Sequence, residues 1–194
     1  MKTNRRGIHI LSQSIWQQPE TKNRMNEIIW RSAKEEDLIF EKEPVENRVT
    51  AHPARVHADF TRMLAGMPLK FPETRDVLKE IQAQLNEIGF VPVKEDRHVC
   101  SEELGIVGHI DAGGLIEGDV PVIIEVKSVR FLPQVVRASE AAQLMLYALA
   151  RNEAQAGSML LLAVYVQPAP PYRVGIRAVI DFEALEPIVR QLAA

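Results

Sequence analysis

The clearest pattern of apolar and polar positions lies in residues 72–89, where apolar side chains recur every three or four positions. They form one stripe, made of Val77, Leu78, Ile81, Leu85 and Ile88. Acidic residues stand in the first turn and Gly89 follows the last apolar position, as is typical of the two ends of a helix. The pattern therefore predicts an amphipathic helix over residues 72–89.

The same spacing predicts four more helices, over residues 22–43, 54–64, 138–155 and 182–192. Pro44 ends the first of them, and Gly157 follows the third. Residues 1–20 show a short alternation that favours a strand or an ordered arm. Residues 44–54 hold two prolines and no periodicity, so we expect a loop there.

Short β-branched runs separated by turn residues predict strands between the helices. Four of them form a predicted meander over residues 90–95, 97–100, 105–116 and 121–129. Residues 158–166 are almost entirely apolar, which favours a central strand covered on both faces, and residues 172–180 alternate like an edge strand. This order predicts an α/β fold with a mixed sheet flanked by helices. We expect one compact domain, with an arm and helix in residues 1–53 and the core in residues 54–194.

Three charged residues lie within or beside apolar strands, where unpaired charges are rare. Glu125 and Lys127 are two positions apart, so a strand places both side chains on one face. Asp111 ends the preceding apolar run, and residues 112–121 resemble the tip of a hairpin. We therefore expect Asp111 to lie beside Glu125, so that two carboxylates and one lysine converge.

This combination suits metal-assisted hydrolysis of a phosphodiester. Carboxylates such as Asp111 and Glu125 can hold Mg²⁺ or Mn²⁺, and the carbonyl of Val126 could join them. A metal would neutralise the phosphate and lower the pKa of a bound water. Lys127 could orient that water or offset charge in the transition state. The alternative is an interior ion pair beside a turn aspartate.

Composition narrows the classes of protein. The chain has 194 residues, 46% of them hydrophobic and 25% charged, with a net charge of −3, which fits one globular domain and gives no overall attraction to nucleic acid. Residues 159–166 form the longest apolar run, too short to cross a bilayer, and the N-terminus lacks a secretory pattern, so we expect a cytoplasmic protein with no membrane partner. Cys100 is the single cysteine, which excludes an internal disulfide and an iron–sulfur cluster built by this chain.

Three short motifs follow one another on the predicted elements. They are G-x-x-D at Gly108–Asp111, E-x-K at Glu125–Lys127 and Q-x-x-x-Y at Gln143–Tyr147. Together they resemble the RecB-type branch of the PD-(D/E)XK nuclease superfamily, over roughly residues 54–166. That branch includes the RecB nuclease domain, CRISPR-associated RecB-like nucleases, and mitochondrial and phage exonucleases.

The resemblance implies a restriction-endonuclease-like fold and a Mg²⁺- or Mn²⁺-dependent deoxyribonuclease of the branch without an iron–sulfur cluster. It implies that His57 is a further metal ligand, and that Gln143 and Tyr147 face the site from a helix to position the strand. Glu95 could open a strand at the site, as in the family, or be a solvated strand end. The commoner task in this branch is exonuclease action on single-stranded DNA ends in repair, recombination or DNA processing. A helicase or a recombination or CRISPR component would be a separate chain.

Several residues keep two interpretations. His109 shares a predicted strand face with Asp111 and could contact substrate or metal, or lie at the edge of the site. Arg130 and Arg137 follow Lys127 in a loop and could hold a phosphate backbone, or be ordinary surface arginines. Trp16 and Trp30 are most simply packing residues, although stacking on single-stranded bases is open.

Two other functions also stay open at this stage. One is an endonuclease of the same superfamily that nicks or resolves duplex or branched DNA. The other is a non-catalytic nucleic-acid-binding subunit that keeps the fold.

Overall fold

A computed structural model gives the architecture of the chain and describes residues 6–35, 39–41, 51–93, 97–169 and 172–194. The strand end at Glu95 and most of the predicted loop over residues 44–54 lie outside these ranges. No helix within the described ranges has the length and apolar character needed to cross a membrane.

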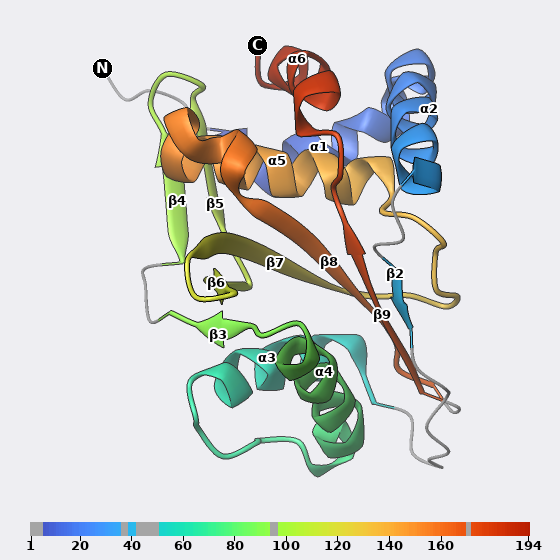
Figure 1. The fold of residues 1–194 in the computed structure, drawn as a ribbon, viewed down its shortest axis with the longest axis vertical. Helices are drawn as coiled ribbons and strands as arrows, with labels where there is room; N and C mark the ends of the chain where they lie inside the picture. The colour runs from blue at the N-terminus through green and yellow to red at the C-terminus, as the bar shows by residue number, and fades with distance from the viewer. Residues whose placement is uncertain (1–5, 36–38, 42–50, 94–96, 170–171) are drawn as a thin grey trace.

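A six-stranded mixed sheet forms the centre of the molecule (Figure 1). In spatial order its strands are β2 (Ile39–Glu41), β9 (Arg173–Ala178), β8 (Leu160–Gln167), β7 (Val120–Ser128), β6 (Ala112–Ile116) and β3 (Val91–Pro92). Only β7 and β8 run parallel, and the other neighbouring pairs are antiparallel. As predicted from its continuous apolar run, β8 is a central strand buried on both faces.

A second, three-stranded sheet lies beside the first. It consists of β1 (Arg6–Gly7), β5 (Ile106–His109) and β4 (His98–Ser101). The predicted strand over residues 105–116 is therefore two strands, because the chain bends at Ile110 and Asp111 as it passes from one sheet to the other. The predicted meander is likewise divided between two sheets.

Helices cover both faces of the large sheet (Figure 1). On one face lie α3 (Pro53–Leu64) and α4 (Arg75–Glu87), which follows the short 3₁₀ turn Pro72–Thr74. On the other face lies α5 (Ala138–Asn152), followed by the 3₁₀ segment Glu153–Ser158. Three further helices pack over α5, namely α1 (Ile8–Ser14) with the 3₁₀ turn Ile15–Gln17, α2 (Pro19–Glu35) and α6 (Phe182–Ala193).

These layers produce two apolar cores separated by the sheet. Along β7, Val122, Ile124 and Val126 pack toward α3 and α4, whereas Ile123 packs toward α5. Strand alternation places Glu125 and Lys127 on the same face as Ile123. The acidic and basic side chains of β7 are therefore directed to the α5 side of the sheet.

The mixed sheet flanked by helices and the N-terminal helical elaboration are confirmed, and the architecture is compatible with a restriction-endonuclease-like fold. Three details of the prediction are wrong. Residues 8–14 are helical, because Ile8 and Leu11 bury one face while Ile10 remains exposed. Helix α2 starts at Pro19 and ends by Glu35, and part of the predicted helix over residues 22–43 is strand β2. Because β2 pairs outside it, β9 is an internal strand. Cys100 is exposed.

Candidate active site

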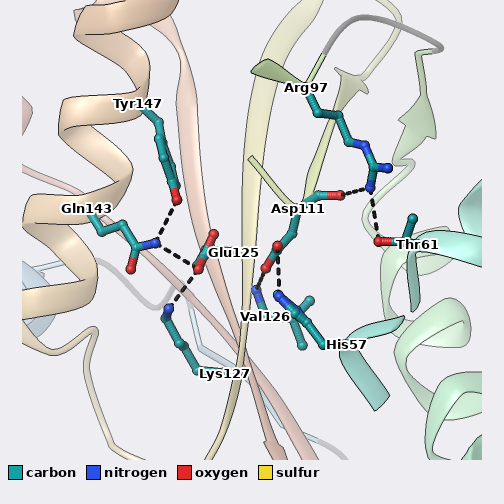
Figure 2. A network of polar contacts seen from close by, with 9 residues as sticks. All are labelled: His57, Thr61, Arg97, Asp111, Glu125, Val126, Lys127, Gln143 and Tyr147. Atoms are coloured by element: carbon teal, nitrogen blue, oxygen red, sulfur yellow. Dashed lines mark hydrogen bonds and ion pairs between the residues drawn. The ribbon is translucent and has the colours of Figure 1, made fainter. Parts of the chain in front are cut away.

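Glu125 and Lys127 form a close pair on β7 (Figure 2). The Lys127 ammonium lies 2.7 Å from Oε1 of Glu125, as expected for alternate residues of one strand. Glu125 is buried, with 4% of its surface exposed, whereas Lys127 is half-buried. A buried carboxylate therefore has a cation on one side, and its Oε2 has no hydrogen-bond partner.

Asp111 approaches Glu125 from the neighbouring strand, as the hairpin prediction required. The β6–β7 register pairs Ala112 with Ile124, so the preceding residue, Asp111, lies next to Glu125. The backbone N–H of Val126 donates to Oδ2 of Asp111 at 2.8 Å. The N–H and C=O of a strand residue point to the same neighbour, so the Val126 carbonyl also faces the edge that Asp111 occupies.

Helix α3 brings His57 to the same cluster across more than fifty residues of sequence. Its Nε2 lies 2.9 Å from Oδ1 of Asp111 (Figure 2). Burial lowers the pKa of His57, although the charge of Glu125 acts in the opposite direction. The imidazole is therefore held in its neutral form near neutral pH, which is the form that binds metals.

Helix α5 closes the other side of Glu125 (Figure 2). The Gln143 amide donates to Oε1 of Glu125 at 2.9 Å and to the Tyr147 hydroxyl at 2.7 Å. Both side chains are buried and lie on one face of α5. Through the Gln143 amide, this face of the helix holds the Glu125 carboxylate. Gly108 is part of this contact, because a Cβ at that position would lie 2.6 Å from the Tyr147 ring. The first and third sequence motifs thus meet in space.

The two carboxyl groups are difficult to ionise together. Burial raises the pKa of Asp111 to about 6, against which the Val126 N–H and the Lys127 charge act. Burial and the charge of Asp111 raise the pKa of Glu125 to about 7, and Lys127 opposes the shift. Two adjacent acids with raised pKa values form a site that gains stability from an added positive charge.

The donor set fits a hard divalent cation. Within the described residues, no group of three or more His, Cys, Asp and Glu side chains already converges in a metal-binding arrangement. Oε2 of Glu125 and Nδ1 of His57 are buried without hydrogen-bond partners, although buried polar atoms are normally paired. Asp111, Glu125, His57 and the Val126 carbonyl supply the oxygen and imidazole ligands that Mg²⁺ or Mn²⁺ accepts.

Two residues that the sequence did not single out fix the geometry around Asp111. The Arg97 guanidinium donates to the Thr61 hydroxyl of α3 at 2.9 Å and to the Asp111 carbonyl at 3.3 Å (Figure 2). Arg97 thus joins α3 to the bend that presents Asp111. It also lines a hollow of about 370 Å³ next to Asp111, between α3 and the β3–β6 edge. No local sequence pattern indicates this role, since a single exposed arginine before a strand is common.

The remaining predicted residues lie outside this network. His109 is exposed at the end of β5, and its ring contacts that of His98 edge to face at 4.9 Å. Because the chain bends after β5, strand alternation no longer relates His109 to Asp111. Arg130 and Arg137 are exposed, lying over the rings of Phe131 and Tyr165, respectively.

Comparison with known proteins does not identify a family for this chain. No protein-family model matches the chain, and no curated protein matches it. Among solved structures, it is similar to the crystal structure of SSO0001, at 21% identity, over 73% of this chain and 68% of that one, with a TM-score of 0.35. A similarity of this size carries no argument about function.

Proposed function

We propose that the chain is a Mg²⁺- or Mn²⁺-dependent deoxyribonuclease that hydrolyses phosphodiester bonds. One observation carries the proposal: Asp111 and Glu125 are adjacent carboxyl groups with raised pKa values, and Lys127 contacts one of them. A pair of carboxylates that destabilise each other is relieved by a shared proton or by a bound cation, and near neutral pH a divalent cation can supply the missing positive charge. The order of the three motifs, which resembles PD-(D/E)XK nucleases, supports the same reaction.

The residues have separable roles in this proposal. Asp111, Glu125 and neutral His57 would hold the metal, with the Val126 carbonyl facing the same edge. When bound, the metal supplies charge neutralisation at the phosphate and a water of lowered pKa. Lys127 would orient the attacking water and offset the negative charge that develops on the phosphate oxygens. Gln143 and Tyr147 fix the Glu125 carboxylate, so they act through it.

Replacement of Lys127 tests the proposal. With Mn²⁺ or Mg²⁺ and an end-labelled single-stranded oligonucleotide, we expect Lys127→Ala to lower the cleavage rate at least about 100-fold, as for other donors that stabilise a transition state. The matched control is Lys79→Ala, which removes an exposed lysine of α4 on the opposite side of the sheet. Circular dichroism checks that both variants fold. Equal rates for the wild type and Lys127→Ala would contradict the proposal.

The preferred substrate is a single-stranded DNA end, which follows the commoner task of the RecB-type branch. Linear and circular single-stranded DNA of equal length, incubated side by side, test this part. An exonuclease degrades the linear strand and spares the circle, whereas cleavage of the circle identifies an endonuclease. Binding of both substrates without cleavage under either metal would instead identify a non-catalytic subunit.

A further inference from the structure

A second hollow, of about 380 Å³, lies between the N-terminal helices and the loop that joins β7 to α5. It is lined by Ile15, Trp16, Lys22, Asn26, Trp30 and the segment 133–139. Figure 1 shows α2 and this loop on the same side of the molecule. Its volume falls within the range of about 300–1,000 Å³ that is typical of small-ligand sites.

The aromatic residues of this hollow are exposed. Trp16 and Trp30 have 52% and 44% of their surfaces accessible to solvent, so neither side chain is buried in the core. Lys22, Asn26 and Trp30 are four residues apart along α2 and therefore share one face of the helix. Two large indole rings thus stand at the surface beside polar side chains that can bind ligands.

The two charged residues that line the hollow, Lys22 and Arg137, are both basic. Lys22 places its ammonium 3.7 Å from the centroid of the Trp16 ring, and Arg137 lies on the opposite wall. Among the described residues that line the hollow, none is acidic. Two partly exposed indole rings, two cations and the Asn26 amide line the same hollow. These groups suit a single-stranded nucleic acid, whose bases stack and whose phosphates are negative.

The hollow is also close to the candidate active site. Ser139 lines the hollow, and Gln143, which contacts Glu125, lies one helical turn further along α5. Four residues of α-helix advance about 6 Å along the axis. The lining of the hollow and the side chain that holds Glu125 are therefore about one helical turn apart along α5.

We propose that this hollow binds the bases of a single-stranded nucleic acid by stacking on Trp16 and Trp30, with Lys22 and Arg137 contacting its phosphates. The assignment rests on the proposed function, since the stacked strand is the one that the site would cut. A protein surface with complementary acidic residues is the competing occupant. The position of the hollow beside the site favours the nucleic acid.

The two tryptophans give a direct signal, because they are the only two in the chain. Their intrinsic fluorescence is measured in EDTA, so that no cleavage occurs, while oligodeoxythymidylate or oligouridylate is added to the full chain. We expect quenching by one or both oligomers, and weaker quenching by an abasic oligomer with the same number of phosphates. Preference between the two oligomers separates DNA from RNA. Absence of quenching by both would overturn the proposal.

Affinities of variants for a dye-labelled oligomer complete the test. We expect Trp16→Leu and Trp30→Leu each to weaken binding about tenfold, the size of one lost stacked base. Trp16→Phe and Trp30→Phe retain a ring and should keep most of the affinity. Ile10→Ala, which removes an exposed apolar side chain of α1, is the control and should bind like the wild type.

Failure of this inference is distinct from failure of the proposed function. Wild-type affinity in both leucine variants would overturn base stacking here, even if the protein cleaves DNA with Mn²⁺. Conversely, suppose that the oligomer quenches the fluorescence and binds the leucine variants more weakly, but the protein never cleaves. That result would support base stacking in the hollow and contradict the proposed nuclease activity.

Lys22→Gln should lower the slope of log affinity against log salt by about 0.7, as for one lost single-strand phosphate contact. An unchanged slope would contradict the role of Lys22.

Discussion

At the scale of single residues, the site is defined by the competition between burial and charge. Asp111 and Glu125 lie in the low-dielectric interior beside each other, and Lys127 compensates only part of their charge. An acid whose pKa is raised on folding keeps its proton while the unfolded chain has already lost it. The folded state therefore loses stability as the pH rises from the unfolded pKa through the folded one.

This argument gives a prediction for the metal-free protein. The contribution of Asp111 and Glu125 to its free energy of unfolding should decrease between about pH 4 and pH 7, the interval between the ordinary carboxyl pKa values and the raised value of about 7 for Glu125. Asp111→Asn removes one charge of the pair, so it should stabilise the protein at pH 8, on the order of 1 kcal/mol, with little effect at pH 4. Urea unfolding at both pH values measures this. A variant that is destabilised at pH 8 would contradict the electrostatic account.

The motifs explain why these residues could be found from the sequence. Acids and a lysine inside β-branched segments are unusual, and their spacing of two fixes a common strand face. His57 required the resemblance, because its position on α3 gives no sign of contact with Asp111. Arg97 and Thr61 could not be found, since their hydrogen bonds depend on how α3 packs against the bend after β5.

At the scale of elements, helices α2 to α6 and the central strand followed from periodicity, whereas helix α1 and the boundary between the two sheets did not. Residues 105–116 read as one strand because Ile110 continues its apolar pattern into Ala112. Only the tertiary contacts of the two sheets reveal the bend. The same limit affects β9, since the sequence of β9 cannot show that the distant residues 39–41 pair outside it.

Asp59, which is not part of the three motifs, stabilises the connection between helices α3 and α4. Its buried carboxylate accepts hydrogen bonds from the backbone N–H groups of Lys70 and Phe71 and from the Thr74 hydroxyl, at 2.8–2.9 Å. Burial alone would raise the pKa of Asp59, but these hydrogen bonds lower it. The carboxylate thus holds the segment between α3 and α4 against the helix that carries His57.

We expect Asp59→Ala to lower the free energy of unfolding by about 2–4 kcal/mol, because it leaves partly buried donors unpaired. Since the folded pKa is depressed, the stabilisation is present above the ordinary aspartate pKa and is lost as the pH falls through the folded value. Urea titrations at neutral pH measure the loss. Arg62→Ala is the control, as Arg62 lies 3.9 Å from Asp59 and is partly exposed, and it should change stability by less than about 1 kcal/mol. Equal losses in the two variants would contradict the role given to the backbone hydrogen bonds.

At the scale of the whole molecule, the N-terminal segment is part of the core. Helix α5 is buried along almost its whole length because α1, α2 and α6 cover the side that the sheet does not. Strand β1 also extends the small sheet. The described residues before residue 54 thus complete the packing around the helix that positions Glu125.

This packing predicts a single unfolding transition. Ile8→Ala should cost about 2–5 kcal/mol, since Ile8 is fully buried against the α5 core. Ile10→Ala, two positions away and 72% exposed, should stay within about 0.5 kcal/mol of the wild type. Tryptophan fluorescence reports on unfolding of the N-terminal segment, and far-ultraviolet circular dichroism reports on unfolding of the whole chain. Two separate transitions would show that the segment unfolds independently of the core.

The most direct test of the central claim is metal-dependent hydrolysis by the wild type and by Glu125→Gln. End-labelled linear single-stranded DNA is incubated with Mn²⁺, with Mg²⁺ or with EDTA, and products are resolved by length. We expect cleavage by the wild type with a metal, none in EDTA, and a loss of at least about 100-fold in Glu125→Gln, which keeps the shape of the side chain but loses its charge. Absence of cleavage by the folded wild type with either metal, or an equal rate in Glu125→Gln, would contradict the proposed nuclease.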